Sequence, residues 1–155
     1  MLVAETLRKY PPVMILNRES NAGYRIPDTD VVLDKGTPII VTVYGLHHDP
    51  NIFPDPERFD PERFSEEQKA QRHPYVYLPF GEGPRICIGM RFGLVQTKVG
   101  LINILSRYGV EPSEKSVRHL FLEPRSFLMT PKGGTQLRLS KRPSVASCHK
   151  TPLPL

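Results

Sequence analysis

The stretch Phe80-Gly81-Glu82-Gly83-Pro84-Arg85-Ile86-Cys87-Ile88-Gly89 decides how this sequence is interpreted. It is a glycine-rich loop that leads a single cysteine, Cys87, to the start of a long segment with helical spacing of apolar residues. Backbone N–H groups and the helix dipole at such a start favour the thiolate form of a cysteine. The stretch therefore predicts a cysteine placed for chemistry rather than for packing.

Three chemistries suit such a stretch. A nucleophilic cysteine needs a base, and no histidine lies within thirteen residues of Cys87 on either side, although a spatial neighbour stays open. A phosphate-binding loop needs Lys-Ser/Thr after its last glycine, where Met90-Arg91 stands instead. The third is a thiolate ligand to haem iron, with Arg85 available for a propionate and the glycines letting a flat macrocycle approach the backbone.

Downstream of the loop, the sequence predicts a helix of about 20 residues and a terminal hairpin. The helix is expected to be buried on several sides, because its apolar residues cover more than half of the helical wheel. These residues are Ile88, Phe92, Leu94, Val95, Val99, Leu101, Ile102 and Leu105. The hairpin strands are predicted at residues 127–130 and 136–140, joined by Pro131-Lys132-Gly133-Gly134.

Upstream of the loop, the expected order is a helix, short strands and a long irregular segment. Residues 2–10 read as a helix that Pro11-Pro12 stops. Residues 31–33 and 39–43 read as strands of a hairpin around Asp34-Lys35-Gly36. Residues 49–84 are rich in proline and have little periodicity, and so long an irregular segment is usually functional.

Composition narrows the possible classes of protein. The 155 residues have 39% hydrophobic side chains and only two cysteines, which argues against a disordered chain, a disulfide-dense scaffold and a four-ligand zinc site. No run of 18 apolar residues occurs. The net charge of +5 gives no case for nucleic acid, because residues 1–123 hold 15 basic and 16 acidic side chains and the surplus lies after them.

Three motifs together resemble the cytochrome P450 monooxygenases. Phe80, Gly83, Arg85, Cys87 and Gly89 match the haem-binding signature F-x-x-G-x-R-x-C-x-G of that family. Residues 5–8 match its E-x-x-R motif and residues 61–64 match its P-E-R-F motif, in the same order along the chain. The resemblance is closest to the microsomal insect type, family six, and covers residues 1–142, the C-terminal third of a full-length member. The expected fold is the C-terminal portion of the mixed, mostly helical P450 fold, and residues 143–155 are expected to be a disordered tail.

The resemblance implies a haem-thiolate site. Cys87 would be the axial ligand of the iron of heme b, and the other residues implied in haem binding are Phe80, Gly81, Gly83, Arg85, Gly89 and Arg18. Glu5, Arg8 and Arg63 would form a buried charged triad that holds the irregular segment on the core. An apolar substrate would contact Val13, Met14, Ile15, Leu16 and Phe127, although ordinary core packing explains any one of them equally well.

Two further features have a simpler interpretation. His47-His48-Asp49 looks like a metal cluster, but adjacent side chains of a short helix point apart, so a metal role is not expected. Cys148 stands in the basic tail without a motif and reads as a free thiol.

The resemblance also implies an activity and partners. A full-length member would insert one oxygen atom of O2 into an apolar small molecule, with electrons from an NADPH-dependent reductase, on the cytosolic face of the endoplasmic reticulum membrane, which it reaches through an N-terminal anchor. The reductase would dock on a basic face of Lys69, Arg72, Arg91 and Lys98. The family's oxygen-activating helix has no counterpart in these residues, so the fragment alone is expected to be inactive. The alternative is a non-catalytic truncated product or interaction fragment.

Overall fold

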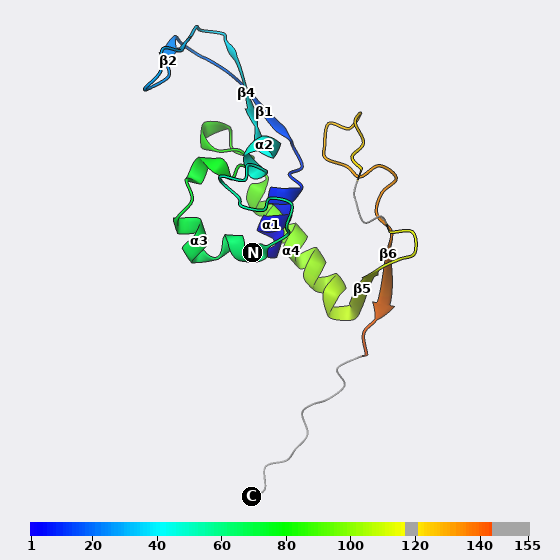
Figure 1. Cartoon of the computed structure of the whole chain (residues 1–155). Helices are drawn as coiled ribbons and strands as arrows, with labels where there is room; N and C mark the ends of the chain where they lie inside the picture. The colour runs from blue at the N-terminus through cyan, green and yellow to red at the C-terminus, as the bar shows by residue number, and fades with distance from the viewer. Residues whose placement is uncertain (117–120, 144–155) are drawn as a thin grey trace, which may run out of the picture. The chain divides into compact units, whose positions relative to one another are not determined.

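A computed structural model of the chain describes residues 1–116 and 121–143 (Figure 1). The expected tail, with Cys148, lies almost wholly outside these residues. The chain forms two compact units, each described here by itself. Unit 1 comprises Met1–Ile88 with Leu122–Lys132, and unit 2 comprises Gly89–Phe121 with the chain from Gly133 onward. Both units mix helices with short antiparallel strands, so the expected mixture of helix and sheet is present.

Unit 1 begins with helix α1 (Leu2–Lys9), which confirms the predicted helix and its end. Tyr10 leaves the helical conformation at φ −131° and ψ 66°, because the ring of Pro11 disfavours helix in the residue before it. The buried residues of α1 are the charged pair Glu5 and Arg8 rather than apolar ones. A helix that buries two charges depends on what those charges bind, which places α1 at the centre of the site described below.

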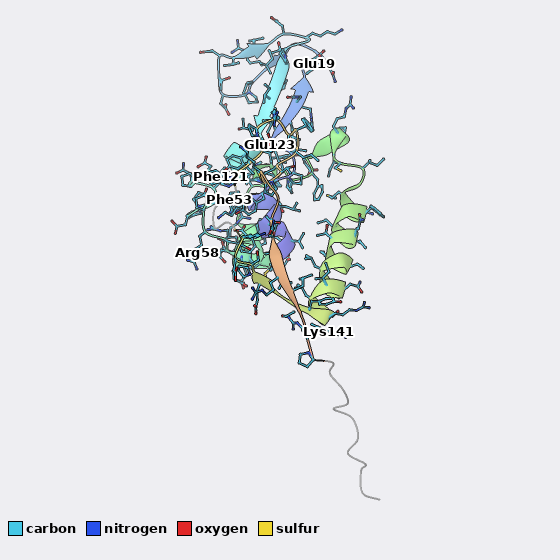
Figure 2. All side chains as sticks on the ribbon, turned by 90° about the vertical axis from the view of Figure 1, so that its right-hand side faces the viewer. Glu19, Phe53, Arg58, Phe121, Glu123 and Lys141 are labelled. Atoms are coloured by element: carbon cyan, nitrogen blue, oxygen red, sulfur yellow. The ribbon has the colours of Figure 1, made fainter. Side chains whose placement is uncertain are left out.

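The strands of unit 1 form one long ribbon in two parts. Strand β1 (Ile15–Glu19) pairs antiparallel with β4 (Pro38–Thr42), with Asn17 opposite Ile40. Strands β2 (Tyr24–Arg25) and β3 (Val32–Leu33) pair antiparallel farther along the ribbon, and Figure 2 shows Glu19 at the end of β1 that leads toward them.

The predicted hairpin around Gly36 is therefore wrong in its pairing. Gly36 does adopt the positive φ expected of a turn, +86°, but the strands on its two sides pair with β1 and β2 instead of with each other. The N–H of Gly36 donates to the carbonyl of Ser20 at 2.7 Å, so the turn is a bend within one arm of the ribbon. Ile15 and Leu16 were interpreted only as substrate-contacting and Arg18 only as haem-binding, and no strand was predicted here, which hid the true partner of β4.

Between β4 and Ile88, unit 1 contains only short helices, and the predicted irregular segment, residues 49–84, accounts for most of this stretch. They are α2 (Val43–His47), η1 (Pro61–Phe64), α3 (Glu66–Ala70), η2 (Pro74–Val76) and η3 (Gly83–Arg85). Side chains cap four of them: Asp60 accepts the N–H of Glu62, Ser65 that of Gln68, His73 that of Tyr75 and Glu82 that of Gly83. The apolar core against which they pack consists of Val43, Phe53, Phe64 and Leu78, and Phe53 is labelled in Figure 2.

Unit 2 contains helix α4 (Met90–Arg107) and a ribbon of β5 (Tyr108–Pro112) with β6 (Leu137–Lys141). The predicted long helix is confirmed, but its predicted burial is wrong: Phe92 is 72% exposed and Ile102 67%. The helical spacing of apolar residues shows which side chains favour burial. It does not show which part of a protein buries them. The predicted terminal hairpin is also wrong, because β6 pairs with β5 and residues 127–130 form no strand.

Within residues 1–116 and 121–143, no helix has the length and apolar character needed to cross a membrane.

Candidate functional site

The cysteine loop, residues 80–88, is shaped by three backbone hydrogen bonds. The carbonyl of Leu78 accepts the N–H of Gly81 at 3.1 Å, the carbonyl of Gly83 accepts that of Ile86 at 3.0 Å, and the carbonyl of Phe80 accepts that of Cys87 at 2.9 Å. Gly81 and Gly83 have φ of +72° and +77°, a region in which a side chain is strained. Gly81 and Gly83 are therefore required by the path of the chain, whereas Gly89, at φ −86°, is not required on this ground.

Cys87 ends this loop with its thiol exposed and unpaired. The closure of the loop by the Phe80 carbonyl holds the backbone of Cys87 while its side chain stays open to solvent. Gly89, the residue before α4, begins unit 2. A cysteine fixed in backbone position and free at sulfur can bind a metal centre of an external group.

Strand β1 brings Arg18 to the cysteine loop. A Cβ atom placed on Gly81 would lie 3.5 Å from Nη2 of Arg18 and 3.8 Å from Cδ1 of Leu16. Arg85 is exposed on the loop itself. Among the described residues, neither Arg18 nor Arg85 has a carboxylate within 4.0 Å, so both guanidinium groups are available to an external anion. An exposed thiol on a loop that carries one such group and is approached by the other suits a haem that carries two propionates.

Beneath the loop, the structure brings the three members of the predicted triad together. Glu5 and Arg8 are both fully buried and pair through two bonds, Nε to Oε2 at 2.7 Å and Nη2 to Oε1 at 2.9 Å. Arg63 approaches less closely, with Nε 3.7 Å from Oε1 of Glu5. The N–H of Asp60 donates to the same oxygen at 2.9 Å. Glu5 is thus shared by α1 and the irregular segment.

Arg8 extends this cluster to α2 and the irregular segment. Its Nη1 donates to the carbonyl of His47 at 2.8 Å, and its Nη2 donates to the carbonyl of Pro56 at 2.7 Å. A planar guanidinium with five donors can hold a carboxylate and several carbonyls at once, which a lysine cannot do. Arg8 therefore joins three parts of unit 1 through a single side chain.

His47 is a buried residue of this cluster that sequence reasoning missed. Its side chain is fully buried, its Nδ1 lies 3.1 Å from the carbonyl of Arg8, and its Nε2 lies 3.0 Å from the amide nitrogen of Leu78. An amide N–H can only donate, so Nε2 is the acceptor and Nδ1 carries the proton that binds the Arg8 carbonyl. The ring is neutral and held in one tautomer. The sequence contains no signal for this, because all of its partners are distant in the chain.

The two adjacent histidines do point apart, as expected. His48 is partly exposed, and its Nδ1 lies 2.9 Å from the carbonyl of Tyr44.

The buried position of His47 makes the stability of the fold depend on pH. Burial lowers its pKa from 6.5 to about 4, because the cation would lose its hydration and would lie near Arg8; the bond to the Arg8 carbonyl opposes this shift but is the smaller effect. Below pH 6.5 the unfolded chain binds a proton that the folded chain does not, so stability falls as the pH drops toward 4. The full loss is on the order of 3 kcal/mol.

We expect denaturant unfolding of the chain to show this loss between pH 6.5 and 5, where few carboxylates titrate. His47→Gln, which cannot be protonated, should reduce the slope of stability against pH in this window. The same slope in the variant and the unchanged chain would contradict the assignment of a buried neutral imidazole.

The predicted substrate-contacting segments lie next to each other in unit 1. The carbonyl of Pro12, just before Val13, accepts the N–H of Met129 at 2.9 Å. Val13, Met14 and Leu16 are half-buried, whereas Ile15 is 41% exposed and Phe127 75% exposed. The structure thus joins the two segments by a backbone bond and leaves apolar side chains of both open.

The predicted basic docking face requires a correction at Arg72. Its guanidinium lies over the ring of Phe53 at 4.5 Å and over that of Phe64 at 5.3 Å, and its Nη2 donates to the carbonyl of Arg63 at 3.0 Å. Burial lowers the pKa of Arg72, but a guanidinium titrates so far above neutral pH that the side chain remains a cation. Arg72 therefore packs the irregular segment and is only partly exposed, whereas Lys69, Arg91 and Lys98 are exposed.

Comparison with known proteins identifies the family. The sequence profile of the cytochrome P450 family matches residues 1–138. The chain is 46% identical over 140 residues to the probable cytochrome P450 6a14 of Drosophila melanogaster, covering 90% of this chain and 28% of that protein. It is 45% identical over 147 residues to cytochrome P450 6k1 of Blattella germanica, covering 95% of this chain and 28% of that protein.

The chain therefore belongs to the cytochrome P450 family. Within it, the chain is similar to insect members of family 6, including cytochrome P450 6B2 of Helicoverpa armigera at 44% identity over 142 residues. It spans about 28% of the length of these relatives.

Proposed function

We propose that this chain is the haem-ligand part of a longer monooxygenase, in which Cys87 binds the haem iron through its thiolate. One observation carries the proposal: the exposed thiol of Cys87 stands on a loop whose backbone is fixed, which also bears Arg85 and which Arg18 approaches at Gly81, and neither arginine has a carboxylate partner among the described residues. When bound, the haem supplies the reductive activation of O2.

The residues of unit 1 would act on the haem and the substrate in three ways. Arg18 and Arg85 bind and orient the haem through its propionates, and Gly81 keeps the space beside Arg18 clear. The apolar side chains of residues 13–16 and Phe127 contact the substrate and exclude water from it. The triad of Glu5, Arg8 and Arg63 holds the irregular segment, and with it the cysteine loop, against α1.

The proposal is tested on the extended protein, by which we mean this chain continued upstream by its own transcript and loaded with haem. With NADPH, a P450 reductase and an apolar test substrate under isotopically labelled O2, one labelled oxygen atom should enter the product and the other should leave as water. Product without the label, or formed equally well without NADPH, would contradict a monooxygenase.

The runner-up is a short non-catalytic product. One observation favours it: apolar side chains of α4, Phe92 and Ile102 among them, are exposed in the part of the chain that the structure describes. Sequencing the transcript upstream of Met1 separates the two: a reading frame that continues supports the monooxygenase, and an in-frame stop supports the short product.

If Arg18 and Arg85 bind the propionates, replacing one of them should weaken the retention of haem. Arg85→Leu in the extended protein should raise the rate of haem transfer to an acceptor protein roughly tenfold, because one charge-assisted bond to a propionate is lost in a partly solvated place. Arg85→Lys should lose less. Arg138→Leu, which removes an exposed arginine of β6, is the control. Equal rates for the Leu variants at 85 and 138 would exclude Arg85 from the haem site.

Electron delivery is proposed to come from an NADPH-dependent reductase, with the protein held at the endoplasmic reticulum membrane by an upstream anchor. Without Arg72, the proposed basic groups are Lys69, which lies 2.9 Å from Glu66, and the exposed Arg91 and Lys98 of α4. Arg91 and Lys98 are seven residues apart, about two helical turns, and so share a face of the helix.

Reversing both charges with Arg91→Glu and Lys98→Glu should raise the reductase concentration needed for half-maximal turnover roughly tenfold at low salt, and less at high salt. Arg138→Glu is the matched control in the same unit. Unchanged reductase dependence in the double variant would remove α4 from the docking face.

A further inference from the structure

Leu78 is the residue through which the cysteine loop is attached to the rest of unit 1. Its carbonyl accepts the N–H of Gly81 at 3.1 Å and so forms the first turn of the loop. Its own N–H donates to Nε2 of His47 at 3.0 Å. From there, the bond from the N–H of Cys87 to the carbonyl of Phe80 closes the loop. The imidazole of His47 is therefore linked to the backbone of Cys87 through the peptide of Leu78 and the backbone hydrogen bonds of the loop.

On its other side, the imidazole is fixed to α1. Nδ1 of His47 donates to the carbonyl of Arg8, and Arg8 returns a bond from its guanidinium to the carbonyl of His47. The residue before Leu78 makes a parallel attachment, since the hydroxyl of Tyr77 donates to the carbonyl of Ala4 at 2.9 Å. Burial raises the pKa of Tyr77, which keeps this hydroxyl protonated as a donor. Two consecutive residues thus join the start of the loop to the helix.

Packing alone does not explain a histidine here. The ring lies against Tyr77, with centroids 5.2 Å apart and planes at 24°, and meets Phe53 edge-on at 6.2 Å. A phenylalanine would make the same aromatic contacts. It would leave the buried N–H of Leu78 and the carbonyl of Arg8 without partners, which costs more than the bonds themselves are worth.

We propose that His47 is a positioning residue for the haem thiolate: its ring fixes the peptide of Leu78 to the end of α1 and so sets where the cysteine loop begins. The proposal rests on Cys87 being the haem ligand, but the hydrogen-bonded path stands on the geometry of unit 1 alone. His47 touches neither substrate nor haem in this role and acts through Leu78.

Two variants with amide side chains distinguish the hydrogen bond made by Nε2 from the one made by Nδ1. The side-chain amide of glutamine reaches the position of Nε2, so His47→Gln keeps an acceptor for the N–H of Leu78. Asparagine is shorter and reaches only the position of Nδ1, so His47→Asn keeps the donor to Arg8 and loses Leu78. Both variants lose the aromatic contacts equally, which makes them a matched pair.

The first measurement uses the 155-residue chain and needs no haem. Amide hydrogen exchange of Leu78 should be roughly tenfold faster or more in His47→Asn, the loss expected for one buried hydrogen bond, and that of Cys87 should also rise. In His47→Gln both amides should stay close to the unchanged chain. The amide of Ser20, bonded to Thr37 in the ribbon, is the internal control.

The second measurement uses the extended protein. The reduced carbon monoxide complex of His47→Asn should lose its thiolate-type absorption faster on standing than that of His47→Gln, which should resemble the unchanged protein. Equal behaviour of the two variants in both measurements, or faster exchange spread over unit 1 in both, would overturn the proposal and leave His47 a packing residue. Failure of Cys87 as ligand would instead leave the exchange result intact and remove only the second difference.

Discussion

Replacing Cys87 by alanine in the extended protein is expected to abolish the thiolate-type absorption of the reduced carbon monoxide complex and all reductase-supported turnover. In the proposed site this sulfur would hold the haem iron and supply a negatively charged ligand, and alanine has no atom that can bind iron. The loop itself should survive, because its bonds from Phe80, Gly81 and Gly83 are all made by the backbone. The measurement is the absorption difference spectrum together with product formation.

The second cysteine of the chain provides the control. Cys148→Ala should keep both the absorption band and the turnover. Retention of the band in Cys87→Ala would mean that another residue binds the iron, and the proposed function would then fail at its central step.

Removing Arg8 is expected to cause the largest loss of stability. Arg8→Ala leaves the carboxylate of Glu5 buried without its bidentate partner, and it also leaves the carbonyls of His47 and Pro56 without donors. Breaking a buried ion pair in this way costs about 3–5 kcal/mol. Denaturant unfolding of the chain measures it, and Arg8→Lys should recover little, because an ammonium cannot bind two carboxylate oxygens and two carbonyls in one plane.

An exposed ion pair of the same unit serves as the comparison. Arg25 lies 3.5 Å from Asp30, and both side chains are largely in solvent. Arg25→Ala should therefore leave the unfolding midpoint almost unchanged. If Arg8→Ala were no more destabilising than Arg25→Ala, the charges beneath the cysteine loop would not hold it in place.

Local chemistry made several features predictable from sequence. Pro11 fixed the end of α1, and the glycine-rich loop before Cys87 was recognised, although the positive φ of Gly81 and Gly83 was not predicted. Helical spacing predicted α4 along most of its length. Each of these follows from neighbours in the chain, which a single sequence displays directly.

Features that depend on distant residues were not predictable. The pairing of β4 with β1 rather than with β3 is decided by register along the whole ribbon, and the strand at residues 108–112 has little alternation to reveal it. His47 was considered only as a metal ligand, because its bonds go to Arg8 and Leu78, 39 and 31 residues away. Arg72 was expected at a surface for the same reason.

The withdrawal of arginines from solvent changes the charge that the molecule presents. Arg8 is fully buried, the side chain of Arg63 is 12% exposed, and Arg72 is stacked on aromatic rings, whereas of the acidic side chains only Glu5 is buried with them. Residues 1–88 hold 10 basic and 13 acidic side chains, so the isoelectric point near 9.4 of the whole chain does not describe this segment. With three arginines withdrawn against one glutamate, its exterior is more acidic still. On an ion-exchange column that segment should behave as a more acidic body than its composition suggests. Added salt should mainly screen the interactions of its exposed carboxylates.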